Sequence, residues 1–506
     1  MWISLQPPRI DDVDPDSFAP ESTVAVEGRG FGESGRLSVD QLAIPQENIR
    51  RWTSNVIIFV VPQRARSGLL RVTTSDGTSN AVFVTAEDDI PVRFRDRLLE
   101  VSAVAPASAE VGTLVVVQGY GFGPRSAMAE LSFVGEEIGF SVSAGRDLVL
   151  EWSNRRIELV LPHELEAGDY ELSVNGDPTD SRLTVTSPSD APILGEPRQF
   201  AVRTAVTVRT PSVEVYAVLP RGLTFREQPQ AQLIRENVPS RRMGVGPDAT
   251  YHLSSSEDIQ RIDRVVLMER RSVEWSFDEA GSSEILLEPW FRTAYRDYLA
   301  KTEDIPRDSS VVTELRRGLQ LREPVIAIVR AVHRSVVAAL TPDLHGVHDP
   351  VEAVETDQGA GAYAYATLAV ALARSAGVPA RRHFGILLDD GGRSIPHAWV
   401  EFLVPGAGWV PADPALGDGL LSEDIASFRG FYGDDIAQGS FGRLDDRRVT
   451  LSIDGRGVPR LYPAGSMREP DQNWAPGILR LEVPGHSFPD DVESRWEPPV
   501  LFGWFD

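Results

Sequence analysis

A repeated pattern of residue spacings runs through the first 187 residues of this 506-residue chain. In each copy a proline, Pro15 or Pro106, stands 13 residues before the first glycine of a Gly-x-Gly-Phe-Gly element. Each copy also has a tryptophan 10 residues before a proline, and a glycine six residues after that proline: Trp52, Pro62 and Gly68, then Trp152, Pro162 and Gly168. Since matched spacings mark internal duplication, we expect two similar folded units.

Each copy consists of short strand-like segments separated by Gly and Pro turns, which is the pattern of a small β-sandwich. We expect the glycines of the two elements, Gly28-x-Gly30-Phe31-Gly32 and Gly119-x-Gly121-Phe122-Gly123, to allow close backbone approach, and each Phe to fill its sandwich. A phosphate-binding glycine loop is excluded because no helical pattern follows. The copies resemble IPT/TIG domains, immunoglobulin-like modules that bind partners or act as spacers. The resemblance predicts sandwiches over residues 1–90 and 95–187.

Composition excludes several classes of protein. The net charge is −24, so a nucleic-acid partner is not expected. No apolar run approaches the ~18 residues of a membrane span. The start of the chain has neither a basic region nor an apolar region typical of a signal peptide, so we expect the protein to be cytoplasmic or part of a secreted assembly. Cysteine is absent, which excludes disulfides, thiolate metal sites and a thiol nucleophile.

The second half changes character after a Pro-rich linker at 188–197. Valine-rich segments predict strands at 200–218 and 262–277. Apolar residues at helical spacing predict a helix over 324–340, and a second helix over 362–376 that Gly377 ends. Strands are expected at 382–388, 397–404 and 409–412.

Three blocks of sequence carry a family resemblance. They are Ala366–Arg381 with its Gly377-Val378-Pro379 turn, His397-Ala398-Trp399-Val400-Glu401, and Gly408-Trp409-Val410-Pro411-Ala412-Asp413-Pro414. Together they resemble the bacterial transglutaminase-like family, which shares the catalytic logic of papain. The resemblance implies a core at 288–425, a β-rich segment before it at 195–287, and a carboxy-terminal extension at 426–506. The expected fold is therefore multidomain: two all-β immunoglobulin-like sandwiches followed by an α+β transglutaminase-like, papain-like domain.

The resemblance also implies where a catalytic triad would stand. In that family a cysteine at the start of the helix, a histidine and an aspartate act together. His397 and Asp413 occupy the histidine and aspartate positions, with Asp413 expected on the return strand of the hairpin, and position 362 is alanine. Loss of a triad nucleophile lowers kcat by on the order of 10⁶. No Ser or Thr stands at 357–366 to replace it.

Three hypotheses on function stay open. The first is an inactive transglutaminase-like protein that binds a protein or peptide partner or serves in a larger assembly. The second is a cysteine acyltransferase or amidohydrolase whose nucleophile Ala362 has replaced, and the third is a structural or adhesive component. The first two predict a cleft around His397 and the third does not. A fourth possibility concerns the pair alone: His397 and Asp413 would then only stabilise the hairpin.

No cofactor and no metal are expected. His345 and His348 have a spacing seen in metal sites, but no third ligand is evident near them.

Overall fold

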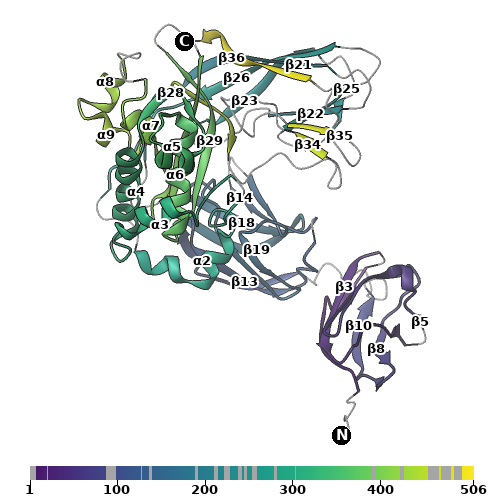
Figure 1. Ribbon diagram of the computed structural model, residues 1–506. Coiled ribbons are helices and arrows are strands. Elements are labelled where there is room, and N and C mark those ends of the chain that lie inside the picture. Colours follow the sequence, from purple (N-terminus) through teal and green to yellow (C-terminus); the bar gives the residue numbers. More distant parts are fainter. Residues whose placement is uncertain are drawn as a thin grey trace. The chain divides into compact units, whose positions relative to one another are not determined.

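The computed structural model describes residues 7–19, 21–40, 42–86, 99–126, 128–135, 139–187, 192–209, 215–220, 228–237, 242–243, 248–253, 259–277, 282–302, 304–389, 394–421, 427–453, 466–468, 480–483 and 493–505. The chain divides into two compact units, Met1–Ser187 and Pro188–Asp506 (Figure 1). Among the described helices, none combines the length and the apolar character that crossing a membrane requires.

The first unit contains two copies of one strand arrangement. In the first copy one sheet has the order β1 (Arg9–Asp14), β3 (Thr23–Arg29), β7 (Val56–Val60), β6 (Ile49–Trp52). Its other sheet has the order β2 (Ser17–Phe18), β10 (Val82–Ala86), β8 (Gly68–Thr74), β4 (Arg36–Val39), β5 (Leu42–Ala43), with β9 (Gly77–Thr78) paired to β8. Apolar side chains from both sheets form one buried core, so the copy is a β-sandwich.

The second copy repeats this order, except that one long strand takes the place of β9 and β10. Its sheets are β11 (Glu100–Ala105), β13 (Leu114–Tyr120), β17 (Arg156–Val160), β16 (Val149–Trp152), and β12 (Ser108–Glu110), β19 (Asp177–Thr186), β18 (Gly168–Val174), β14 (Glu130–Val134), β15 (Gly139–Ser143). A second buried apolar core lies between them. The duplication predicted from the spacings is therefore present in the fold.

The residues of the Gly-x-Gly-Phe-Gly elements have the same contacts in both copies. Phe31 and Phe122 are both 0% exposed, as predicted. The indole N–H of Trp52 donates to the carbonyl of Phe31 over 3.0 Å, and that of Trp152 donates to the carbonyl of Phe122 over 3.3 Å. The matched tryptophans thus hold the turn that places each buried phenylalanine.

A close backbone approach explains the first glycine of each element. A Cβ at Gly28 would lie 2.1 Å from the carbonyl oxygen of Arg9, and one at Gly119 would lie 1.9 Å from that of Glu100. These oxygens belong to β1 and β11, the strands that pair with β3 and β13. Only glycine allows the neighbouring strands to pair this closely.

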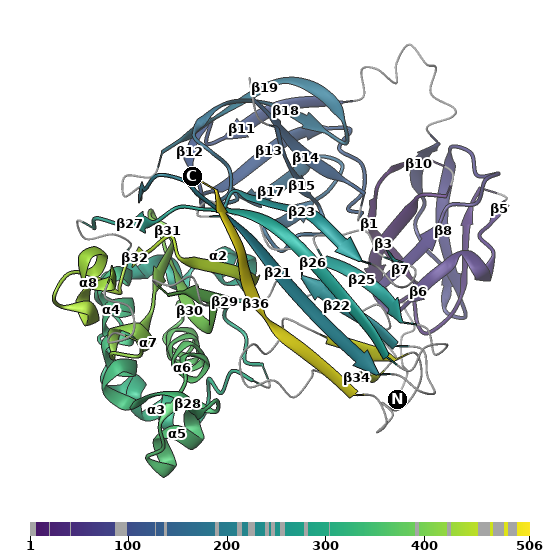
Figure 2. The same ribbon diagram turned by 90° about the horizontal axis from the view of Figure 1, so that it is seen from above.

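The second unit opens with two sheets that combine distant parts of the chain. One has the order β23 (Gln230–Asn237), β26 (Ile259–Arg270), β21 (Arg198–Arg209), β36 (Glu493–Phe505). The other has the order β24 (Arg242–Met243), β25 (Asp248–Leu253), β22 (Val215–Pro220), β35 (Arg480–Val483), β34 (Ser466–Arg468). Figure 2 shows β36 alongside β21, so the segments expected before and after the core share these sheets.

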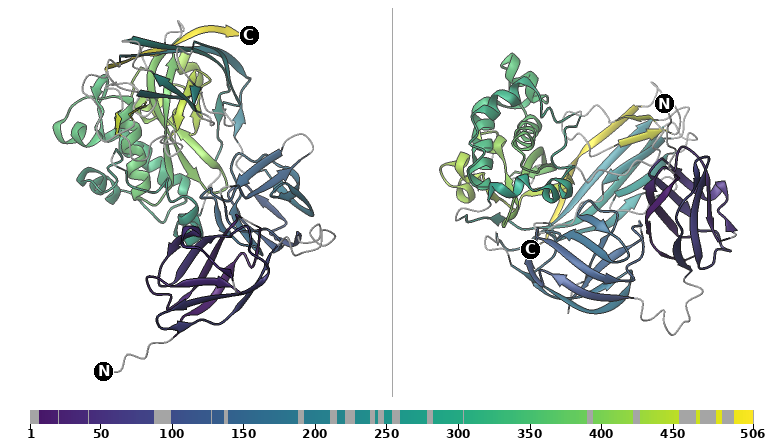
Figure 3. Two further views of the ribbon diagram at one scale, coloured as in Figure 1. Left: turned by 90° about the vertical axis from the view of Figure 1, so that its right-hand side faces the viewer. Right: turned by 90° about the horizontal axis from the view of Figure 1, so that it is seen from below.

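The remaining elements of this unit are helices around a four-stranded antiparallel sheet. The sheet has the order β31 (Gly408–Ala412), β30 (Ser394–Val404), β29 (Ala380–Leu388), β33 (Arg448–Ile453). A small sheet joins β20 (Ile193–Leu194), β27 (Val273–Glu274) and β32 (Arg443–Leu444). The helices, grouped together in Figure 3, are α2 (Pro289–Ala294), α3 (Ser310–Arg317), α4 (Val325–Ala339), α5 (Pro350–Thr356), α6 (Ala362–Ser375), α7 (Pro414–Gly417), α8 (Ser427–Tyr432) and α9 (Ile436–Gly439).

Helix α6 lies at the centre of this arrangement. Twelve of its 14 residues are buried, because it packs against β29 and β30 on one side and against α3, α4 and α5 on others. A helix that is apolar on every face belongs in a core. Gly377, with φ of 85°, takes the left-handed conformation that ends it, and Gly361 precedes its first turn. The predicted helices at 324–340 and 362–376 are confirmed to within a residue at each end.

Candidate functional site

The structure brings together two of the three predicted site residues. His397 lies within β30, and its Nε2 is 2.7 Å from Oδ2 of Asp413. Both side chains are 0% exposed. The prediction that Asp413 lies on the return strand is wrong in one respect: β31 ends at Ala412, and Asp413 is the N-cap of α7. Its Oδ1 accepts the backbone N–H of Leu416 over 2.9 Å, which fixes the carboxylate and leaves Oδ2 for the imidazole.

A buried arginine that the sequence reasoning did not single out completes the environment of Asp413. Nη1 of Arg448, from β33, is 2.7 Å from Oδ2 of Asp413, and its Nη2 is 3.1 Å from Oδ2 of Asp445. Nη2 also donates to the hydroxyl of Tyr432 over 3.0 Å, and this hydroxyl donates to Asp445. Arg448 is 0% exposed, so the carboxylate of Asp413 lies between two buried basic groups, His397 and Arg448.

Electrostatics favour the ionised form of this aspartate. Burial by itself would raise the pKa of Asp413, but His397 and Arg448 outweigh burial and hold this pKa well below its usual range. Burial raises the pKa of Tyr432 well above its usual value, so its hydroxyl stays protonated and donates to Asp445. The site therefore contains a fixed negative charge next to the imidazole at every pH at which proteins commonly work.

The ring of His397 has a defined tautomer. Because a carboxylate only accepts, the nitrogen facing Asp413, Nε2, carries the proton in the neutral ring. Nδ1 is buried and has no hydrogen-bond partner among the described residues. A ring held in this way presents the lone pair of Nδ1 and can take a proton from a neighbouring group, which is the role of the base in a nucleophile–base–carboxylate triad.

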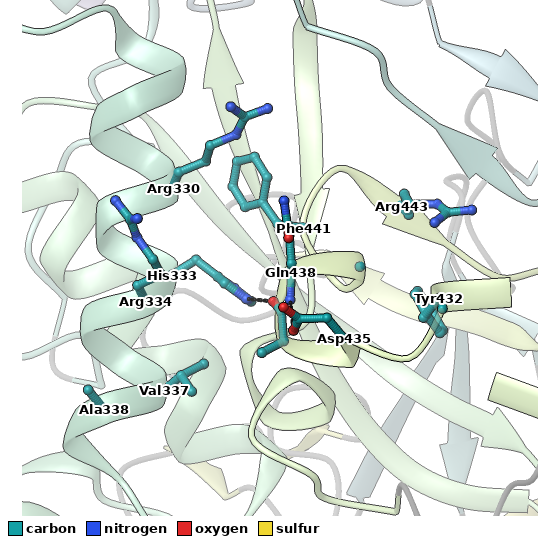
Figure 4. Close-up of a pocket in the computed structure, with 13 residues that line it drawn as sticks. Arg330, His333, Arg334, Val337, Ala338, Tyr432, Asp435, Gln438, Phe441 and Arg443 are labelled. Carbon is teal, nitrogen blue, oxygen red and sulfur yellow. Dashed lines mark hydrogen bonds between the residues drawn. The ribbon is translucent and has the colours of Figure 1, made fainter. Parts of the chain in front are cut away.

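Ala362 is the first residue of α6 and is 9% exposed. Helix α6 packs against β30, the strand of His397, so helix start and histidine belong to neighbouring elements of one core. A helix amino terminus stabilises a thiolate, but the methyl group of alanine can neither ionise nor attack a carbonyl. The pocket described below and shown in Figure 4 is lined by other residues.

A second buried histidine–carboxylate pair, His383 with Glu401, lies further along the same hairpin. Oε2 of Glu401 is 2.7 Å from Nε2 of His383 and 2.6 Å from Nε of Arg381. Burial would raise the pKa of Glu401, but Arg381 and His383 outweigh burial and hold it well below its usual range. The ring of Trp399 stacks on both histidines, with centroid distances of 5.5 Å to His383 and 6.3 Å to His397. Two ion-pair clusters therefore flank one indole.

The sequence offered a weak signal for these additional charges. Glu401 stands between Val400 and Phe402 in a strand that is otherwise apolar, and Arg448 is followed by Val449 at the start of another strand. A charged residue in a fully buried strand is almost always paired. The pattern indicates that each such residue has a charged partner, but it does not indicate which residue that partner is.

The two histidines of the 345–348 segment are not brought into a ligand cluster. His345 is exposed and lies in β28 (Pro342–Val347). The ring centroids of His348 and Tyr363 are 5.9 Å apart, and burial lowers the pKa of His348. Within the described ranges, no group of three or more His, Asp or Glu side chains is arranged to hold a metal ion.

Comparison with protein families gives a match in the region of this site. The sequence profile of the transglutaminase-like superfamily matches residues 310–414, from the start of α3 to the first residue of α7. Residues 310–414 form a transglutaminase-like domain. The match includes α6, β29, β30 and β31, and therefore Ala362, His397 and Asp413 of this domain. A search of curated proteins finds no match.

The solved structures that the comparison matches to this chain share little sequence with it. A candidate cysteine protease from Cytophaga hutchinsonii is 8% identical, with a TM-score of 0.38, over 62% of this chain and 96% of its own. The periplasmic domain of TgpA from Pseudomonas aeruginosa is 16% identical, with a TM-score of 0.23, over 62% and 93%. The protein SGBP-B of the mixed-linkage glucan utilization locus of Bacteroides ovatus is 11% identical, with a TM-score of 0.22, over 53% and 75%.

Proposed function

We propose that the transglutaminase-like domain is a catalytically inactive binding module, which holds a protein or peptide partner without cleaving it or transferring its acyl group. The observation that carries the proposal is Ala362 at the start of α6, where the family has its nucleophilic cysteine, in a chain that contains no cysteine. His397 and Asp413 keep their 2.7 Å contact nonetheless. We further propose that the two β-sandwiches of the first unit are IPT/TIG-like modules that present this domain.

Covalent acyl transfer requires a group that attacks a carbonyl, and the contacts of the two tyrosine hydroxyls next to position 362 in the sequence support the proposal that neither is such a group. Tyr363, the next residue, accepts a hydrogen bond from Arg382 over 3.0 Å, and Tyr365 donates to Asp418. Burial raises the pKa of Tyr365 far above its usual value, so its phenolate does not form near neutral pH. The residual activity of a triad without its nucleophile rests on binding and on any oxyanion contacts, and its kcat is on the order of 10⁶ below that of the intact enzyme.

The test of this proposal compares the protein with a variant that has a cysteine at position 362. We expect the protein to release no ammonia from a glutamine-containing peptide and to form no trappable acyl adduct with it. In Ala362→Cys we expect the rate of thiol alkylation by iodoacetamide to show a pH midpoint below the ~8.5 of a free cysteine. In Ala362→Cys/His397→Ala the midpoint should move up, because the neighbouring base is gone.

Two results would contradict the proposal. Ammonia release by the protein as it stands would show that another group acts as nucleophile. Equal alkylation midpoints with and without His397 would show that this ring is not placed to serve a group at position 362, so that the site is not a triad that lacks only its sulfur.

One structural observation favours each of the two other functions. The intact His397–Asp413–Arg448 arrangement favours an acyltransferase or amidohydrolase whose cysteine is replaced in this chain; ammonia release by Ala362→Cys would support it. The complete burial of the His397 and Asp413 side chains favours a structural component. A thiol at position 362 that iodoacetamide reaches only after unfolding would support the structural role.

A further inference from the structure

A pocket of ≈ 920 Å³ lies between α4 and the segment 432–443, which carries α9. Its floor includes His333, whose Nε2 is 3.0 Å from the carbonyl of Ala437. The peptide N–H of Asp413 donates to the carbonyl of Ser440 over 2.9 Å, so the pocket and the site above share this backbone. Its other lining residues include Arg330, Arg334, Gln438, Phe441 and Arg443, as Figure 4 shows.

The lining is locally positive in a chain of net charge −24. Arg330 and Arg334 stand four residues apart on α4, hence on one face of the helix, where two like charges destabilise it by a few tenths of a kcal/mol. Within the described part of the chain neither forms an ion pair with a carboxylate. The one acidic lining residue, Asp435, caps α9 by accepting the N–H of Gln438 over 3.1 Å. Its charge is thus turned toward the helix end.

Aromatic rings hold one of these guanidinium groups in place. Cζ of Arg330 is 5.6 Å from the ring centroid of Phe441 and 5.4 Å from that of Phe277. Phe441 is itself packed edge-on against His333, with centroids 5.8 Å apart. A guanidinium stacked on a ring keeps its N–H edge free for a carboxylate, which it binds through two parallel hydrogen bonds. Figure 4 shows Arg330 beside the ring of Phe441.

His333 adds no charge to this pocket at neutral pH. Burial lowers the pKa of His333 below its usual range, and its neutral ring uses Nε2–H for the carbonyl of Ala437. Asp413 raises this pKa and Arg334 lowers it, but burial has the largest effect. The positive charge therefore comes from Arg330 and Arg334, which stay charged at all working pH values. The third arginine of the lining, Arg443, forms an ion pair with Glu274, with 3.2 Å between Nη2 and Oε2.

We propose that this pocket binds an acidic peptide segment of a partner protein, with two of its carboxylates on Arg330 and Arg334. The volume exceeds what a single carboxylate or inorganic anion fills and is of the size that takes a multi-atom ligand. Arg330 and Arg334 lie one helical turn apart, a separation that the carboxylates of two Glu or Asp side chains of one peptide can span. The apolar lining residues Val337, Ala338 and Phe441 then contact the aliphatic atoms between these carboxylates. This is a second site, distinct from the one on which the proposed function rests.

The experiment measures fluorescence anisotropy of a fluorescein-labelled hexaglutamate peptide titrated with the full chain, at low and at physiological salt. We expect saturable binding that weakens with salt and is absent for hexaglutamine. Arg330→Gln/Arg334→Gln should weaken it at least about tenfold. Both side chains are exposed, so we expect the fold to be kept, and circular dichroism checks it.

The matched control is Arg317→Gln, which removes one charge from an exposed arginine on α3 outside the pocket, and should leave the affinity unchanged within about twofold. Three results would overturn the proposal: equal weakening by Arg317→Gln, no effect of the double variant, or binding of oligogalacturonate but not of hexaglutamate. None of them bears on the alkylation test at position 362. The two proposals can therefore fail separately.

Discussion

Replacing Arg448 by methionine should strongly destabilise the second unit. The guanidinium of Arg448 is 0% exposed, with 2.7 Å between Nη1 and Asp413 and 3.1 Å between Nη2 and Asp445. Methionine fills a similar volume without charge and leaves two buried carboxylates with fewer partners. Removing one partner of a buried ion pair costs about 3–5 kcal/mol. Since His397 and the N–H of Leu416 still contact Asp413, we expect a loss of about 3–4 kcal/mol.

Hydrogen–deuterium exchange along a urea series, read by mass spectrometry, measures this loss locally. It gives the opening free energy of peptides from β30 and β33 separately from those of the first unit, which should not change. The matched control is Arg317→Met, whose ion pair with Glu314 has both side chains 71% exposed. It should cost only about 0–1 kcal/mol.

The same variant should alter the dependence of stability on pH. The pKa of Asp413 in the folded protein lies below its unfolded value of about 3.9, so its ionisation stabilises the fold above that value. This stabilisation is lost as the pH falls toward the folded pKa. Without Arg448 the folded pKa of Asp413 moves back up, so the difference in free energy of unfolding between the protein and Arg448→Met should narrow as the pH falls from about 5 toward the low folded pKa of Asp413. A loss below about 1 kcal/mol at pH 7, or a constant difference over this pH range, would refute the reasoning.

Two further changes test other contacts. Glu401→Gln should cost about 3 kcal/mol, because it leaves the guanidinium of Arg381 buried without its counter-charge; exchange of β29 peptides in urea measures it, and a loss below about 1 kcal/mol would contradict the expectation. Gly119→Ala should lower the thermal unfolding midpoint of the first unit, at a cost of about 3 kcal/mol, since its Cβ would meet the carbonyl of Glu100 at 1.9 Å. The control is Gly139→Ala, whose Cβ would lie 3.8 Å from its nearest neighbour, the carbonyl oxygen of Phe133. Equal unfolding midpoints of the two variants would show that the strands around Gly119 move apart at little cost.

Local patterns in the sequence predict those parts of this fold that local physics determines. The spacing of apolar residues and a proline at the first turn predict 324–340 as a helix, and the structure has α4 at Val325–Ala339. The duplicated spacings predict two like sandwiches, and both have one strand order. The N-cap role of Asp413 also had a local signal, because Asp followed by Pro414 is typical of a helix start.

Long-range contacts could not be read in this way. Arg448 contacts Asp413, which lies 35 residues earlier in the chain, and no local pattern in either segment predicts this contact. The pairing of β36 with β21 joins residues almost 300 positions apart. The proposed catalytic positions were matched through family resemblance, and the loss of activity at Ala362 stays a prediction until it is measured.

The pairing of β36 with β21 has a consequence for synthesis on the ribosome. Strand β21 emerges early in the second unit and finds β26 soon afterwards, but its other edge has to wait until residues 493–505 have been made. An uncovered strand edge readily pairs with a foreign chain, and such late closure slows folding. The growing polypeptide therefore carries an aggregation-prone strand edge for the whole time in which its helical domain is being translated.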